Sequence, residues 1–172
     1  MSMDSDGLRN LQAPLKELYR RDPDKALVTL HASGRIGDNL TCKVDTGRAI
    51  AEAGLHPATG GDGSALCSGD ILLEALTACA GVTLNAVATA MGIELRDAEI
   101  LAEGDLDFRG TLGVDRDAPV GFQDIRLRFR LDTDANAETL SRLMKLTERY
   151  CVVFQTLNKP PSLSVHRENT GT

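Results

Sequence analysis

The chain has no tryptophan and few other aromatic residues, with four phenylalanines and two tyrosines among 172 residues. One domain of this length can bury a real core, and that core must be built from Leu, Ile, Val and Ala. An excess of basic residues is also missing, because the formal net charge is −6. This charge argues against a general nucleic-acid-binding protein, which is normally basic, and an anionic partner would need a local basic patch.

Signals for secretion and for a membrane span are absent as well. The first seven residues, MSMDSDG, contain neither the basic nor the apolar segment of a secretory signal. The most apolar stretch surrounds Cys79, but Glu74, Thr77, Thr83 and Asn85 interrupt it. We therefore expect a cytoplasmic protein with neither a membrane nor a nucleic acid as partner.

The four cysteines, at positions 42, 67, 79 and 151, form no CxxC motif, and the three histidines are scattered. This spacing gives no reason to expect a metal ion or another bound cofactor. In a reducing compartment such cysteines are free, catalytic or metal-binding more often than they form structural disulfides.

The hydrophobic pattern predicts an α+β fold, because strands and helices do not alternate strictly along the chain. We expect an N-terminal helical extension over residues 1–25, with a helix at 8–21 that Pro14 interrupts, and a single domain over 26–172. The pattern predicts strands at 26–33, 39–44, 93–108, 122–131 and 163–165, helices at 70–91 and 137–150, a turn at 34–39 and a loop at 54–69.

Two of these segments have especially clear patterns. The helix at 70–91 is apolar on almost all sides, which is typical of a helix enclosed by a sheet or by a partner. We expect Ser68 or Asp70 to cap its start and Gly92 to end it. The strand at 122–131 alternates apolar residues with arginines, so one face belongs to the core and the other is a solvated basic face. These arginines are Arg126, Arg128 and Arg130.

Cys79 lies inside the apolar helix, and Cys151 directly follows the helix at 137–150. A reactive thiol needs a pKa below about 8.5, whereas burial raises it. Cys79 is too far from its helix N-terminus for the dipole to help, so a guanidinium, from Arg35 or Arg48, would have to lower its pKa. Cys151 sits at a helix C-terminus, where the dipole disfavours a thiolate. Cys79 is then the attacking thiol and Cys151 the resolving one, unless both simply pack as small apolar side chains.

Four segments together resemble the OsmC/Ohr family of osmotically inducible and organic-hydroperoxide-resistance proteins. They are SGDILLEALTACAGVTL at 68–84, GIEL at 92–95, GFQDIRL at 121–127 and ERYCVV at 148–153. The resemblance extends over residues 26–166, and both Cys79 and Cys151 fall where the family keeps its reactive pair.

The resemblance implies a thiol-dependent peroxidase that reduces organic hydroperoxides or hydrogen peroxide. Cys79 would form a sulfenic acid and then a disulfide with Cys151, which an external dithiol, such as a lipoyl group or a lipoylated protein, would reduce. It also implies an intertwined homodimer, in which β-sheets from both chains wrap around long central helices.

One position departs from the family pattern. The peroxidase branches carry a glutamate ten residues before the attacking cysteine, where it binds an activating arginine, and this chain has Gly69 there. Asp70 and Glu74 are the nearest acidic residues and are possible accessory groups, as is Arg48, while Arg35 resembles the family arginine in its hairpin position. A non-catalytic protein that binds a small molecule, or a thiol redox sensor, is the alternative to a peroxidase.

Overall fold

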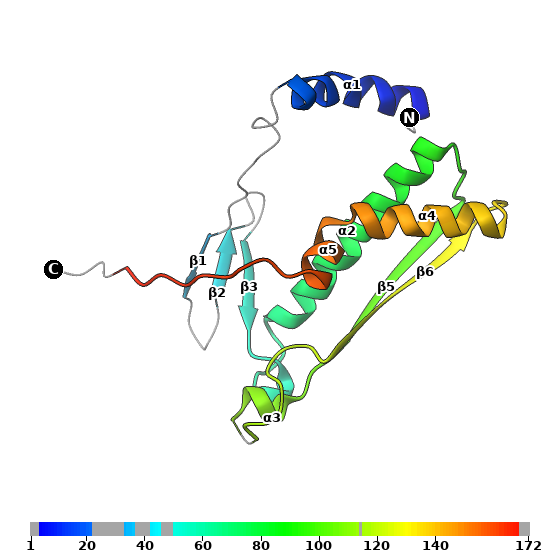
Figure 1. The fold of residues 1–172 in the computed structure, drawn as a ribbon. Coiled ribbons are helices and arrows are strands. Elements are labelled where there is room, and N and C mark those ends of the chain that lie inside the picture. Colours follow the sequence, from blue (N-terminus) through cyan, green and yellow to red (C-terminus); the bar gives the residue numbers. More distant parts are fainter. Residues whose placement is uncertain (1–3, 22–32, 37–41, 46–49, 114, 169–172) are drawn as a thin grey trace.

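The computed structural model of the chain describes residues 4–21, 33–36, 42–45, 50–113 and 115–168. Figure 1 shows helix α2 in the centre, with α4 and α5 packed along it and the long β5–β6 ribbon beside them. In chain order the elements are α1 (Ser5–Arg21), β1 (Ser33–Ile36), β2 (Cys42–Asp45), β3 (Ile50–Gly54), the 3-10 helix η2 (Pro57–Thr59), β4 (Leu66–Cys67), α2 (Ser68–Met91), β5 (Asp97–Asp105), α3 (Phe108–Thr111), β6 (Asp124–Asp132), α4 (Ala137–Tyr150) and α5 (Val152–Asn158).

The strands form two separate sheets. One has the order β1-β2-β3-β4, with antiparallel pairing up to β3 and a short parallel pairing between β3 and β4. The other is the antiparallel β5–β6 ribbon, which extends from Asp97 opposite Asp132 to Asp105 opposite Asp124. Helices and mainly antiparallel strands in one chain confirm the predicted α+β class.

Helix α2 supplies most of the core. Leu76, Ala80, Leu84 and Ala88 recur every four residues, so they share one face, and each is at most 1% exposed. This face packs against the β5–β6 ribbon and against α4 and α5. Leu143 of α4 closes the second half of the core.

The opposite face of α2 is open within the chain. Val82 on this face is 73% exposed, and Ala75 and Ala78 on the same side are exposed as well. An 18-residue window of α2 has a mean hydropathy of 1.7, yet only 22% of that window is buried inside the chain. By length and composition alone the helix could also cross a membrane, a test that core helices of soluble proteins pass too. The predicted all-round burial of this helix is therefore not achieved within one chain.

The two ends of α2 compare differently with the sequence predictions. Gly92 ends the helix as predicted, with φ +67 and its N–H bonded to the carbonyls of Ala88 and Thr89. The predicted N-caps, Ser68 and Asp70, are wrong. The helix begins at Ser68 itself, so Cys67 occupies the N-cap position, and its side chain makes no capping hydrogen bond.

The arginines of β6 lie on an exposed face, as predicted, and each one meets a carboxylate. Arg130 pairs with Glu99 and Arg128 with Glu103, both at 2.7 Å. Arg126 binds both Asp105 and Asp124. This basic face is therefore neutralised by acidic residues of the same ribbon.

The helices at 70–91 and 137–150 and the strand at 122–131 are confirmed within two residues at each end. The N-terminal helix is also present, but it continues through Pro14 without the predicted interruption. The strand predicted at 93–108 is shorter, because β5 ends at Asp105 and Phe108 begins α3.

Other predictions need correction. The turn predicted at 34–39 is wrong for residues 34–36, which belong to β1. Most of the strand predicted at 26–33 lies outside the described residues. The loop at 54–69 contains η2 and β4. The strand predicted at 163–165 is wrong, since residues 159–168 form neither helix nor strand. A strand needs a neighbouring strand, and this segment has none among the described residues.

Candidate active site

The structure brings Cys79 and Cys151 together. Cys79 lies in the middle of α2, and Cys151 separates α4 from α5. Both belong to the cluster that packs around Leu76 and Ala80, and both are free cysteines, each of which shifts the pKa of the other. Cys151 is only 1% exposed, whereas Cys79 is partly exposed.

A change of direction in the chain places Cys151 at this position. Its backbone is extended, with φ −72 and ψ 106, and Cys151 is both the C-cap of α4 and the N-cap of α5. Its N–H bonds to the carbonyl of Thr147, and its own carbonyl accepts the N–H of Gln155, both at 2.9 Å. The first amides of α5 have no partner inside their own helix and are free to face α2.

These free amides affect the pKa of the Cys79 thiol. Burial raises the pKa of the Cys79 thiol, but hydrogen bonds from the Val153 N–H, the Cys151 thiol and the Val152 N–H outweigh burial and hold that pKa below its ordinary value. The Thr83 hydroxyl, which donates to the Cys79 carbonyl at 2.8 Å, lies close enough to contribute as well.

The neighbouring thiol is affected in the opposite direction. Burial is the main cause that raises the pKa of Cys151, and the adjacent Cys79 sulfur raises it further. The Phe154 N–H offsets only part of this rise. Two touching groups whose pKa values are pushed apart can take different roles, here a thiolate at Cys79 and a protonated thiol at Cys151.

Sequence reasoning missed α5, and with it the source of the hydrogen bonds at Cys79. The expectation that an arginine would lower the Cys79 pKa considered only the N-terminus of the helix that carries Cys79, and not the start of a second helix packed against it. The hydrogen bonds that described residues give to Cys79 come from amides, a thiol and a hydroxyl. The helical spacing of Val153, Phe154 and Leu157, all of which pack on the core, is the sequence signal that could have revealed α5.

The two candidate arginines cannot both be placed. Arg35 lies in β1, opposite Lys43 of β2. Arg48 lies outside the described residues. The assignment of either arginine to Cys79 stays a prediction.

The acidic candidates lie away from Cys79. Asp70 and Glu74 line a groove of about 520 Å³ together with Thr77 and Ala102. At about 100° per residue, both point to a different side of α2 from Cys79. The structure thus brings neither acid to the thiol within one chain.

Gly69 sits in apolar surroundings. A Cβ atom at this position would lie 3.4 Å from side-chain atoms of both Leu106 and Phe122 and 3.6 Å from the Cys67 sulfur. An ionised carboxylate extending from here would lose hydration without gaining a described charged partner, which is unfavourable. Among the described residues, no group of three His, Cys, Asp or Glu side chains could hold a metal ion.

Comparison with known proteins gives consistent matches. A family model described as OsmC-like protein matches residues 61–166. The chain is similar to the structure of an OsmC-like protein from Mycoplasma pneumoniae, with a TM-score of 0.65 and 15% identity over 77% of this chain and 89% of that chain.

Two solved structures described as organic hydroperoxide resistance proteins are also similar. The one from Legionella pneumophila has a TM-score of 0.60 and 19% identity, and covers 77% of this chain and 91% of its own. The one from Elizabethkingia anophelis has a TM-score of 0.61 and 17% identity, and the match covers 78% of this chain and 91% of that chain. A search of curated proteins found no match. At these identities the structural likeness establishes the shared fold.

Proposed function

The chain belongs to the OsmC-like protein family, and we propose that it is a thiol-dependent peroxidase that reduces organic hydroperoxides or hydrogen peroxide through Cys79 and Cys151. The observation that carries this proposal is the contact between two thiols whose pKa values shift in opposite directions. A lowered pKa gives Cys79 more thiolate, the nucleophilic form, at a given pH.

The chemistry follows from this division of roles. The Cys79 thiolate attacks the terminal oxygen of the hydroperoxide, the O–O bond breaks, and the alcohol or water leaves after taking up a proton. Cys79 is then a sulfenic acid. The Cys151 sulfur attacks the Cys79 sulfur, its thiol proton and the sulfenic hydroxyl leave as water, and a Cys79–Cys151 disulfide forms. An external dithiol, such as a dihydrolipoyl group on a protein, returns both thiols and is itself oxidised to a disulfide.

A homodimer is the second part of the proposal. The described part of the chain leaves two apolar surfaces uncovered. One is the open face of α2, and the other is a C-terminal segment in which Leu163 is 90% and Val165 96% exposed. A second copy of the chain that covers these surfaces would also enclose the partly exposed Cys79.

The direct test measures hydroperoxide consumption by the full chain with cumene hydroperoxide and an excess of dithiothreitol or dihydrolipoamide. We expect Cys79→Ser to abolish turnover. Cys151→Ser should leave a Cys79 sulfenic acid that dimedone traps. Cys67→Ser is the matched control and should retain turnover, because no described contact links Cys67 to this thiol pair. Absence of turnover by the wild-type chain with either reductant would refute the peroxidase proposal.

A thiol redox sensor is the second candidate, and the burial of Cys151 favours it. A disulfide that includes a sulfur only 1% exposed is difficult for a reductant to reach. In a sensor, the thiol pair would be oxidised once per chain and its disulfide would be reduced slowly. One equivalent of hydroperoxide consumed without further turnover would support this function over catalysis.

A further inference from the structure

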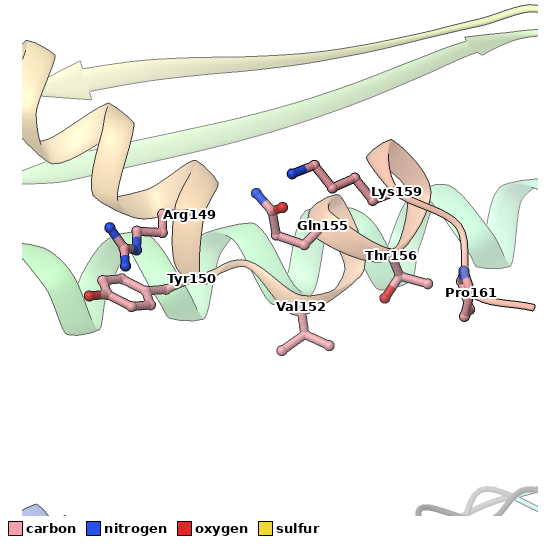
Figure 2. A pocket seen from close by; sticks show the side chains of 7 residues that line it. All are labelled: Arg149, Tyr150, Val152, Gln155, Thr156, Lys159 and Pro161. Carbon is pink, nitrogen blue, oxygen red and sulfur yellow. The ribbon is translucent and has the colours of Figure 1, made fainter.

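A shallow groove crosses the junction between α4 and α5, the point of the chain at which Cys151 lies. It has a volume of about 520 Å³. Its lining comes from the end of α4, from α5 and from the segment that follows: Arg149, Tyr150, Val152, Gln155, Thr156, Lys159 and Pro161. Figure 2 shows Arg149, Gln155 and Lys159 along one side of this segment, and Val152 and Thr156 along the other. The groove therefore has a cationic edge and a largely apolar edge.

The cations of this groove differ from those of the β5–β6 ribbon. In the ribbon, Arg126, Arg128 and Arg130 are all held by carboxylates. In the part of the chain that the structure describes, no carboxylate forms an ion pair with Arg149 or Lys159, and the Arg149 guanidinium instead lies 5.7 Å from the centre of the Tyr150 ring. A chain with a net charge of −6 thus keeps uncompensated positive charge at this place.

Val152 connects the groove to the thiols. Its N–H is one of the hydrogen-bond donors to the Cys79 sulfur, while its side chain is 69% exposed and lines the groove. Cys151 lies between Tyr150 and Val152, two residues that also line the groove. A molecule bound there contacts both chain neighbours of Cys151, one of which, Val152, also has its amide at Cys79.

We propose that this groove docks the dithiol that reduces the Cys79–Cys151 disulfide, and that this reductant is a protein or peptide with acidic side chains next to its dithiol. The inference rests on the disulfide of the proposed function. Carboxylates of the reductant would meet Arg149 and Lys159, and the apolar edge at Val152 would accept the uncharged chain around the dithiol. Docking raises the local concentration of the attacking thiolate.

The reduction itself balances as a two-electron exchange. One thiolate of the reductant attacks a sulfur of the disulfide, forms a mixed disulfide and releases the other cysteine as a thiolate, which takes up a proton. The second thiol of the reductant then loses its proton and attacks the mixed disulfide. The reductant leaves as a disulfide, and Cys79 and Cys151 together have gained two electrons and two protons.

A second copy of the chain is a poorer occupant of this groove. A two-fold symmetric contact centred here would bring Arg149 and Lys159 of both copies close together, and like charges repel. The proposed dimer surfaces instead expose apolar side chains, Val82 on α2 and Leu163 and Val165 in the C-terminal segment.

The test uses the full chain with its disulfide formed by diamide, so that it does not depend on hydroperoxide chemistry. Two peptides serve as reductants, each with a Cys-Gly-Pro-Cys dithiol, one flanked by four glutamates and the other by four glutamines. The rate of return of the Cys79 and Cys151 thiols is measured at low salt, and the ratio of the acidic to the neutral peptide rate is compared between variants.

We expect the wild-type ratio to exceed that of the double variant Arg149→Gln/Lys159→Gln by about tenfold, and to fall toward one in 0.5 M NaCl. The double variant Arg128→Gln/Arg130→Gln changes the net charge equally, away from the groove, and should keep the wild-type ratio. All forms should react equally with dithiothreitol.

A ratio unchanged by Arg149→Gln/Lys159→Gln would overturn the docking inference while leaving the peroxidase proposal intact. The same holds for a ratio that falls equally in the Arg128→Gln/Arg130→Gln control, since net charge would then explain it. Failure of diamide to link Cys79 to Cys151 would overturn both proposals. Absence of hydroperoxide turnover together with a charge-dependent ratio would overturn only the peroxidase.

Discussion

Replacing Val152 with proline tests whether the α5 amides control the reactivity of Cys79. Val152 is the first residue of α5, where its N–H has no partner within the helix, so proline removes only the donor to Cys79. The preceding residue, Cys151, is already extended, as a residue before proline prefers. Val152→Ala is the matched control, because it shortens the same exposed side chain and keeps the N–H.

The expected size of the effect follows from the strength of one charge-assisted hydrogen bond. Such a bond contributes about 1.5–3 kcal/mol, which corresponds to about one to two pKa units. Val152 is the weaker of the two amide donors, and Cys79 is partly exposed, so we expect the lower end of this range. The pKa of Cys79 should therefore rise by about one unit in Val152→Pro and change little in Val152→Ala.

The direction of the pKa change depends on which protonation state of Cys79 the hydrogen bond stabilises. The Val152 N–H favours the thiolate, so its loss moves the whole reactivity profile of Cys79 to higher pH. Well below the pKa the thiolate fraction falls about tenfold, but each thiolate becomes more nucleophilic as its pKa rises. The net loss of rate at low pH should be only about three- to fourfold, so the midpoint of the profile is the better measure.

The assay follows alkylation of Cys79 by iodoacetamide from pH 5 to 10, in a Cys151→Ser background that cannot form the disulfide. Quantifying the peptide that contains Cys79 by mass spectrometry separates it from Cys42 and Cys67. Equal midpoints for Val152→Pro and Val152→Ala, or a lower midpoint for the proline variant, would show that this amide does not stabilise the thiolate.

Two further predictions concern the core and the assembly. The side chain of Leu84 is only 1% exposed and packs between α2 and α4, so Leu84→Ala should lower the free energy of unfolding by about 2–5 kcal/mol. Urea denaturation at a fixed protein concentration measures this loss. A loss below about 1 kcal/mol would contradict the assigned core. Val82→Asp, on the open face of α2, should convert the proposed dimer to a monomer in light scattering with little loss of helical content. A variant that stays dimeric, or a wild-type chain that is monomeric, would contradict the proposed interface.

The elements with strong internal periodicity could be predicted from the sequence. The apolar pattern of α2, the amphipathic pattern of α4 and the alternation in β6 each depend on residues close together in the chain. Gly92 was identifiable for the same reason, because ending a helix in the left-handed conformation is a local requirement.

The sequence predictions failed where the local structure depends on residues that are distant in the chain. Alternation around Leu163 and Val165 predicted a strand, but a strand needs a neighbour, and none of the described residues provides one. Helix α5 was missed because it follows α4 after the single residue Cys151, with neither glycine nor proline to mark the break.

By itself the sequence determined the two candidate thiols, the helices that carry them and the family resemblance, because these depend on local pattern and residue identity. Only the tertiary structure decided that Cys79 and Cys151 pack in one cluster, that the first amides of α5 face Cys79, and that Arg149 and Lys159 line one groove at the α4–α5 junction. Each of these depends on how α4 and α5 pack across α2, and packing joins residues that are far apart in the chain.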